Sequence, residues 1–471
     1  MTLALVSAGL WMGACSFVLD FDSLQDDDEG ADGGAGGTAS GGSGGTGGLD
    51  GGTACGVCDD RDPCTKDFCD TSGDAPTCVY EPQHVVPDGM SISQPLEDIH
   101  NINLVSAGGK FYLSRFAREG GKDDLSLWTF GRSGDAESFV EGARFSTLRK
   151  GTPLAAYEPA SGAGLLAIVE NLTTRLYLVL AARTQTNQDA DVYLMALDEN
   201  LEIVSDGLGN LSLTLPKFAV PDLTRNPIIW LTGGTVNVGW LTRVSALFFP
   251  LDDSMRSWSM TTANPRGLAP LDDGTHPGIL VVGDDFVRTQ IEGGTPVPVA
   301  SCIGDKSQPV TGAGSTRITG SYWYGWWTRG QDDSAISDVT PLACGVGGCL
   351  APTCGNEDRK ASPGTRNPAF ASIQREIEPN VLNIVSAIPN IGVEPPKLEL
   401  SVSSIRLVSG KPDAEVLANT TLGVADEVGA PDNAKIAVSG EDKFAVAWVQ
   451  RQANGAELRV ERYRMCYPDA Q

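Results

Sequence analysis

The sequence predicts an all-β fold, a β-propeller of about six or seven blades preceded by a small disulfide-rich module. Three observations support this prediction. After residue 90, short alternating or apolar stretches separated by turn residues dominate, and runs with helical periodicity are scarce. These stretches form clusters that recur at intervals of roughly forty to seventy residues. Two similar segments lie at the two ends of the same region.

The candidate strands extend through residues 90–471, which we therefore assign to one β-domain. Many form strand-turn-strand pairs, and Asn454-Gly455 is a pair that suits a tight hairpin, because both positions accept positive φ. Strands are predicted at 110–116, 125–130, 164–170, 175–182, 191–197, 226–232, 244–251, 278–283, 321–328, 398–408, 443–450 and 457–463.

The two similar segments are VSAGGKFYL (105–113) and VSGEDKFAV (438–446), which share Val, Ser, Lys and Phe at matching positions. In a propeller the first and last blades pack side by side, so similar units at both ends favour a closed ring. A pair of β-sandwiches is the alternative.

The strand KFAVAWVQ (443–450) indicates how neighbouring blades pack. Its alternation places Phe444 and Trp448 on one face and the small residues Ala445 and Ala447 on the other. A face of small residues allows the adjacent blade to approach closely.

Residues 1–14 have the pattern of a signal peptide. Met1 to Met12 form an apolar run too short to span a bilayer, and Gly13 and Ala14 precede Cys15. The segment WMGAC resembles the lipobox of bacterial lipoproteins, in which the cysteine becomes the lipidated first residue of the mature chain. It departs from that pattern in having Met12 where Leu is commonest and in lacking a Lys or Arg ahead of the run. An ordinary cleaved signal with an incidental cysteine is the alternative.

Residues 15–54 are predicted to form a lipidated N-terminus and a flexible tether. Thirteen of the twenty-three residues 30–52 are glycine, and such a segment buries too little apolar surface to offset the entropy of ordering. Its root-mean-square reach is about 25 Å. With a lipid on Cys15, the tether would hold an exported protein at the outer membrane or the cell surface.

Residues 55–82 form a cysteine-rich module that contains Cys55, Cys58, Cys64, Cys69 and Cys78. The spacing of the first two suits a zinc site, but an exported chain meets an oxidising environment, which favours disulfides. The pattern CDDRDPCTKDFCD (58–70) resembles a cysteine-rich repeat of exported surface proteins of myxobacteria and their relatives. This resemblance implies no particular chemistry.

The aspartates of the module offer oxygen ligands for calcium, although the spacing of an EF-hand is absent. We expect no cofactor and interpret these carboxylates as solvated turn residues, with calcium binding as the alternative. They are Asp59, Asp60, Asp62, Asp67 and Asp70.

Five further cysteines follow in the β-domain: Cys302, Cys344, Cys349, Cys354 and Cys466. Two groups of five require at least one disulfide between the groups if all ten pair. Because the repeat-like motif contains the four cysteines of residues 58–78, we expect these four to pair with one another and Cys55 to reach the β-domain. Cys466 is its most attractive mate, since chain ends are often close together in a closed ring.

The chain has 34 basic and 60 acidic residues and a formal net charge of −26. Such a surface repels nucleic-acid phosphates and anionic lipid heads, so we expect no nucleic-acid partner. The preferred interpretation of the charge is solubility, and a ligand that is neutral, cationic or bridged by calcium is the functional alternative. Motifs of serine hydrolases, zinc proteases and nucleotide-binding proteins are absent, and only three histidines occur. The sequence therefore identifies no catalytic residue.

The stretch YWYGWWT (322–328) is the best candidate for a binding surface. Alternation places Tyr322, Tyr324 and Trp326 on one face, where exposed aromatic rings would stack on sugars or peptide side chains; burial in the core is the alternative. We expect a cell-surface binding or adhesion protein for an extracellular glycan, peptide or partner protein. The alternative is an extracellular polysaccharide hydrolase or lyase acting at the central face, which convergent acidic and arginine residues there would favour.

Overall fold

A computed structural model describes residues 58–467 with internal gaps, of which the longest are 299–309, 330–341 and 351–368. The described residues divide into two compact units. The larger unit spans residues 87–464, and the smaller one contains residues 58–86 together with residues 465–467. Among the described residues, no helix has the length and apolar character needed to cross a membrane.

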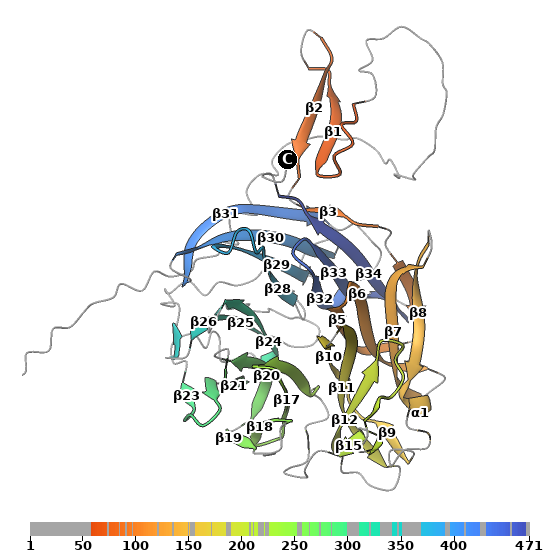
Figure 1. Cartoon of the computed structure of the whole chain (residues 1–471), viewed down its shortest axis with the longest axis vertical. Helices are drawn as coiled ribbons and strands as arrows, with labels where there is room; N and C mark the ends of the chain where they lie inside the picture. Colours follow the sequence, from red (N-terminus) through yellow and green to blue (C-terminus); the bar gives the residue numbers. More distant parts are fainter. Residues whose placement is uncertain are drawn as a thin grey trace, which may run out of the picture. The chain divides into compact units, whose positions relative to one another are not determined.

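In the described part of the larger unit, seven antiparallel sheets of four or five strands follow one another along the chain (Figure 1). We call each sheet a blade. Blade 1 has the order β5 (Asp98–Ala107), β6 (Lys110–Glu119), β7 (Lys122–Ser133), β8 (Ala136–Arg144). Blade 2 has β10 (Gly164–Glu170), β11 (Thr173–Thr184), β12 (Ala190–Asp198), β15 (Ser212–Thr214), and β9 (Tyr157–Pro159) pairs with β11. Blade 3 has β16 (Ile228–Thr232), β17 (Thr235–Leu241), β18 (Ser245–Pro250), β19 (Trp258–Thr261).

The remaining blades repeat this arrangement. Blade 4 has β20 (Pro265–Asp272), β21 (Pro277–Gly283), β22 (Val287–Ile291), β23 (Val297–Pro298). Blade 5 has β24 (Val310–Thr319), β25 (Tyr322–Arg329), β26 (Leu342–Gly345), β27 (Gly348–Leu350). Blade 6 has β28 (Ala369–Gln374), β29 (Val381–Asn390), β30 (Lys397–Val408), β31 (Lys411–Gly423). Blade 7 has β32 (Ala430–Ser439), β33 (Lys443–Gln452) and β34 (Gly455–Met465), and both β3 (Val85–Pro87) and β4 (Ile92–Leu96) pair with β34.

Two short elements lie outside these sheets. The helix α1 (Phe145–Leu148) follows blade 1, and the hairpin of β13 (Ser205–Asp206) and β14 (Gly209–Asn210) lies between β12 and β15 of blade 2. The first strands of successive blades pack on one another, and β32 packs on β5, so the ring closes. These seven first strands are the inner strands. The closed ring confirms the predicted β-propeller and excludes paired sandwiches. Blade 7 combines β4 from the start of the ring with three strands from its end.

The two similar segments of the sequence form neighbouring hairpins, as predicted. They contribute β5 and β6 to blade 1 and β32 and β33 to blade 7, and the Ser106 hydroxyl donates a hydrogen bond to the Val438 carbonyl. The turn between β5 and β6 has Gly108 and Gly109, both at positive φ, as a two-residue hairpin turn of this twist requires. The ring therefore closes between two copies of the same hairpin.

The core consists of apolar clusters between adjacent blades. The cluster between blades 1 and 7 contains Ala445 and Ala447, both 0% exposed, packed with Leu104, Leu113 and neighbours on blade 1. Further clusters lie between blades 1 and 2, blades 2 and 3, and blades 3 and 4. The predicted face of small residues on β33 is thus the face on which blade 1 packs.

The smaller unit contains the hairpin of β1 (Thr65–Asp70) and β2 (Thr77–Pro82), and β3 (Val85–Pro87) lies at the boundary between the units. Two disulfides in this unit are Cys58–Cys78 and Cys64–Cys466. Cys69 is also disulfide-bonded. The module is therefore held by disulfides, as predicted.

The predicted pairing of the four cysteines within residues 58–78 is wrong for Cys64, which bonds Cys466 instead. The prediction of a bond from the module to Cys466 identified the correct partner at the chain end but assigned it to the wrong cysteine. Cys55 lies outside the described residues. The physical reason is the hairpin, which holds Cys64 at its open end, beside Gln83, and separates it from Cys69 and Cys78 near its turn.

Candidate functional site

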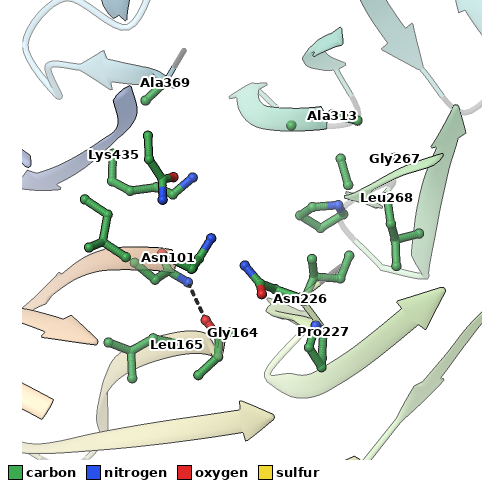
Figure 2. A pocket seen from close by; sticks show the side chains of 18 of the residues that line it. Asn101, Gly164, Leu165, Asn226, Pro227, Gly267, Leu268, Ala313, Ala369 and Lys435 are labelled. Carbon is green, nitrogen blue, oxygen red and sulfur yellow. Dashed lines mark hydrogen bonds between the residues drawn. The ribbon is translucent and has the colours of Figure 1, made fainter. Parts of the chain in front are cut away.

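A cavity of ≈ 520 Å³ lies where the inner strands meet. Residues of all seven inner strands line it, so it occupies the centre of the ring (Figure 2). Its volume is within the roughly 300–1,000 Å³ that small-molecule sites have. The site could not have been located from any single stretch of sequence, because each blade contributes only a few residues.

Side-chain amides from different elements converge on one side of this cavity. Asn101 and Asn103 lie on β5, and Asn226 precedes β16. A Cβ atom placed on Gly162 would lie 2.8 Å from the Asn101 Oδ1 and 2.6 Å from the Asn226 Oδ1. The absence of a side chain at Gly162 therefore allows both amides to occupy the same corner, as Figure 2 shows for Asn101 and Asn226.

Asn103 is held by hydrogen bonds with its surroundings. Its Nδ2 donates to the Ala163 carbonyl at 3.4 Å, and its Oδ1 accepts from the Leu104 N–H at 2.9 Å. This amide therefore joins β5 to the segment before β10. The amides of Asn101 and Asn226 each combine a donor and an acceptor at the cavity wall.

A β-bulge on β32, the inner strand that packs on β5, forms the adjoining part of the cavity wall. Asp432 is paired with Val449, and Lys435 with Ala447, so the two residues between them face a single position of β33. Asn433, in the bulge, is buried and has φ of 55°, a conformation that Asn tolerates better than most residues.

Arg451 on β33 stabilises this bulge. Its Nε donates to the Asp432 carboxylate at 3.0 Å, and its Nη2 donates to the Ile99 carbonyl of β5 at 3.1 Å. Its Nη1 also lies 3.7 Å from a carboxylate oxygen of Asp98. One guanidinium thus links the inner strands of blades 7 and 1 and binds the carboxylate of Asp432.

Lys435 follows the bulge and extends into the cavity (Figure 2). Burial, which removes water from the ammonium group, lowers the pKa of Lys435, and the charge of Asp432 opposes this effect only in part. Among the described residues, no carboxylate lies within the 4.0 Å of an ion pair with this lysine.

The rest of the lining is mixed. Arg266 and Ser315 come from blades 4 and 5, and the Ser315 hydroxyl donates to the Pro270 carbonyl. His100 lies at a second bulge, on β5, with its ring nitrogens 3.8 Å from Asp98 and 3.5 Å from Asp123. Apolar contacts come from Leu165, Leu268, Phe370 and their neighbours.

The residues of the sequence-predicted aromatic platform lie on the second strand of blade 5. Tyr322, Tyr324 and Trp326 lie on β25, which is confirmed as a strand, opposite Thr319, Thr316 and Gly314 of β24. Their side chains lie outside what the structure describes. Blade 5 instead contributes Ala313, Gly314 and Ser315, on its inner strand, to the described lining.

The other predicted site residues are divided between the described and undescribed parts of the chain. Cys344 and Cys349 occupy opposite positions of β26 and β27, and their side chains lie outside the description. Cys15, Cys55, Cys302 and Cys354 lie outside the described residues, so their lipidation and pairing stay predictions.

The aspartates of the small module act as acceptors for nearby N–H groups. Asp59, Asp60 and Asp62 each accept a backbone N–H two residues further on, at 2.8 Å, and Asp70 accepts the Ser72 N–H at 2.9 Å. Within the described part of the chain, no group of three or more His, Cys, Asp or Glu side chains is arranged to hold a metal ion. These carboxylates therefore stabilise turns.

The sequence matches no protein-family model and no curated protein. Among solved structures, a protein of unknown function from Dyadobacter fermentans is similar, with 10% identity, a TM-score of 0.42, and coverage of 81% of this chain and 100% of that chain. The intramolecular trans-sialidase from Ruminococcus gnavus has 7% identity and a TM-score of 0.38, covering 79% and 95%. A β-fructofuranosidase from Bombyx mori has 11% identity and a TM-score of 0.31, covering 79% and 92%. At these values we draw no functional conclusion from the likeness.

Proposed function

We propose that this chain is a cell-surface lipoprotein that binds a glycan in the central cavity of its propeller. The observation that carries the proposal is the lining of that cavity, where the amides of Asn101 and Asn226 share one corner and Lys435 extends from β32, the inner strand next to β5. Sugar hydroxyls both donate and accept hydrogen bonds, and side-chain amides do the same. Apolar residues such as Leu268 and Phe370 offer contact for the C–H faces of a sugar ring.

The composition of the cavity supports binding over hydrolysis. Glycoside hydrolysis commonly uses two carboxyl groups on either side of the scissile bond. Of the described lining residues, Asp432 is the one acid, and its carboxylate is bonded to Arg451. The described lining therefore offers polar and apolar contacts for a sugar. It does not offer the two carboxyl groups, one acid and one base, that would cleave a glycosidic bond.

The surface location in this proposal rests on the lipobox-like segment at Cys15 and the glycine-rich residues 30–52. A lipid at one end and a binding propeller at the other would present the cavity to extracellular polysaccharide. The tether would let the propeller sample its surroundings within a reach of about 25 Å.

Ligand-observed NMR with the full chain and a panel of soluble oligosaccharides tests the proposal. We expect Asn226→Leu to abolish saturation transfer to a bound oligosaccharide, because it replaces an amide of the cavity corner by an apolar group. The matched control is Asn200→Leu, at an exposed turn whose N–H is bonded to Asp198. Binding that survives Asn226→Leu but is lost in Tyr324→Ala would move the site from the cavity to β25 and overturn the proposal.

A further inference from the structure

We infer that the cavity selects a saccharide that carries a carboxylate group, and that Lys435 is the residue that recognises this group. The inference rests on the glycan binding proposed above and names the class of glycan. It follows from the register of β32, the partner of Asp432 and the environment of the lysine.

The bulge places Asp432 and Lys435 on one face of blade 7. In a regular strand, two residues three positions apart point to opposite faces. Here their partners on β33 are Val449 and Ala447, which are two positions apart and share the face that packs on blade 1. The extra residue of the bulge therefore brings an acid and a base to the same side of the strand at the cavity wall.

These two charges do not neutralise each other by direct contact. The Asp432 carboxylate is bound by Arg451, which is itself fixed by the Ile99 carbonyl. Lys435 has no ion pair with a described residue. Within the described part of the chain, the ammonium group therefore has no carboxylate at ion-pair distance, and Asp432, whose charge acts on it from farther away, is bound by Arg451.

A desolvated ammonium group favours an anionic ligand. Burial destabilises the charged form, as the lowered pKa of Lys435 indicates, and a carboxylate from the ligand restores the lost stabilisation. A carboxylate carries one negative charge and so matches one lysine, whereas a phosphate carries nearly two. The amides of Asn101 and Asn226 have N–H groups to donate to hydroxyls of the same ligand.

The net charge of −26 does not prevent such binding. Exposed charges farther away than about 8 Å are largely screened at physiological ionic strength, whereas a partly buried ammonium in contact with its ligand is screened much less. The overall charge disfavours long polyanions at the surface. The overall charge still permits a single acidic sugar, or the end of a polysaccharide chain, to bind inside the cavity.

Two matched pairs of sugars test the inference. D-galacturonic acid differs from D-galactose, and D-glucuronic acid from D-glucose, only at C6, where a carboxylate replaces a hydroxymethyl group. We expect ligand-observed NMR titration of the full chain to show about tenfold tighter binding of the acid in at least one pair. Lys435→Met should abolish this preference, and Lys435→Arg should retain it.

The control variant is Lys397→Met, which removes an exposed lysine paired with Glu399 at 3.6 Å on β30 and should leave the preference unchanged. Thermal unfolding of each variant verifies that it folds.

One outcome is that the wild type binds the acid and the neutral sugar equally, and that Asn226→Leu loses both. That result overturns the carboxylate preference and keeps the glycan site. A preference that persists in Lys435→Met overturns the role of the lysine. No binding of either sugar, or of any oligosaccharide in the panel, overturns both proposals.

Discussion

Removing the Cys64–Cys466 disulfide should destabilise the propeller, although neither cysteine belongs to that unit. The bond joins residues 402 positions apart, and the loop that it closes contains every strand from β1 to β34. The Cys58–Cys78 bond spans only 20 positions within the small unit. The first bond therefore restricts the unfolded propeller chain, and the second does not.

The difference can be calculated from loop-closure entropy. Closing 402 positions corresponds to about 6 kcal/mol at 25 °C, and closing 20 positions to about 3 kcal/mol. Measured effects often fall below this model, because unfolded chains retain structure. We therefore expect Cys64→Ser combined with Cys466→Ser to lower the free energy of unfolding by about 4 kcal/mol. For a unit of this size the corresponding fall in Tm is about 5 °C.

Urea unfolding followed by tryptophan fluorescence measures this change, because Trp128, Trp230 and Trp448 are buried in the propeller. The matched control is Cys58→Ser combined with Cys78→Ser, which should leave the urea midpoint of the propeller unchanged. Equal shifts in the two double variants, or no shift in either, would refute the loop-closure reasoning.

Two further predictions concern the blade contact and the anchor. Ala447→Leu inserts a larger side chain at a position that is 0% exposed between blades 7 and 1, so it should destabilise the propeller by about 1–3 kcal/mol. The same urea transition measures it, and an unchanged midpoint would contradict the tight packing described. Cys15→Ala should release the protein from membranes into the soluble fraction, because each buried methylene of a lipid contributes about 0.8 kcal/mol. Membrane association that equals the wild type in cell fractionation would show that Cys15 carries no anchor.

The fold could be predicted because propeller blades leave local signals. The hairpins at 105–113 and 438–446 share residues that turn and pack in the same way, and the alternation of Ala445 and Ala447 identifies the contact face. Other strands left no such signal. Lys411–Gly423 forms β31 although its sequence contains proline and several polar residues, because pairing with β30 outweighs its own weak preference.

The candidate site was missed for a different reason. Asn101, Asn226 and Lys435 lie on three blades, and only ring closure brings them to one cavity. A partial signal existed in DIHNINLVSA, where the polar residues Asn101 and Asn103 interrupt an inner strand. The segment PDNAK (431–435) has the composition of a turn, and its role as a bulge depends on pairing with β33.

The net charge of the chain and that of the described cavity lining differ in sign. As a functional alternative, the sequence predicts a neutral, cationic or calcium-bridged partner from its net charge of −26, but the described cavity lining contains Lys435 and Arg266 against one aspartate. Net charge describes the whole surface and its solubility, whereas recognition depends on the few groups that a ligand touches.

The joining of early and late residues has a consequence for biosynthesis. A ribosome makes the chain from its N-terminus, so β4 and Cys64 emerge long before β34 and Cys466, their partners. Until β34 and Cys466 have been made, blade 7 is incomplete and the Cys64 thiol remains beside the other cysteines of its own module. An early bond with one of them must be exchanged before the native bond forms, which gives a thiol-disulfide isomerase a defined substrate. The Cys64–Cys466 bond can therefore form only after the last strand of blade 7 has been made, so its presence distinguishes complete propellers from incomplete ones.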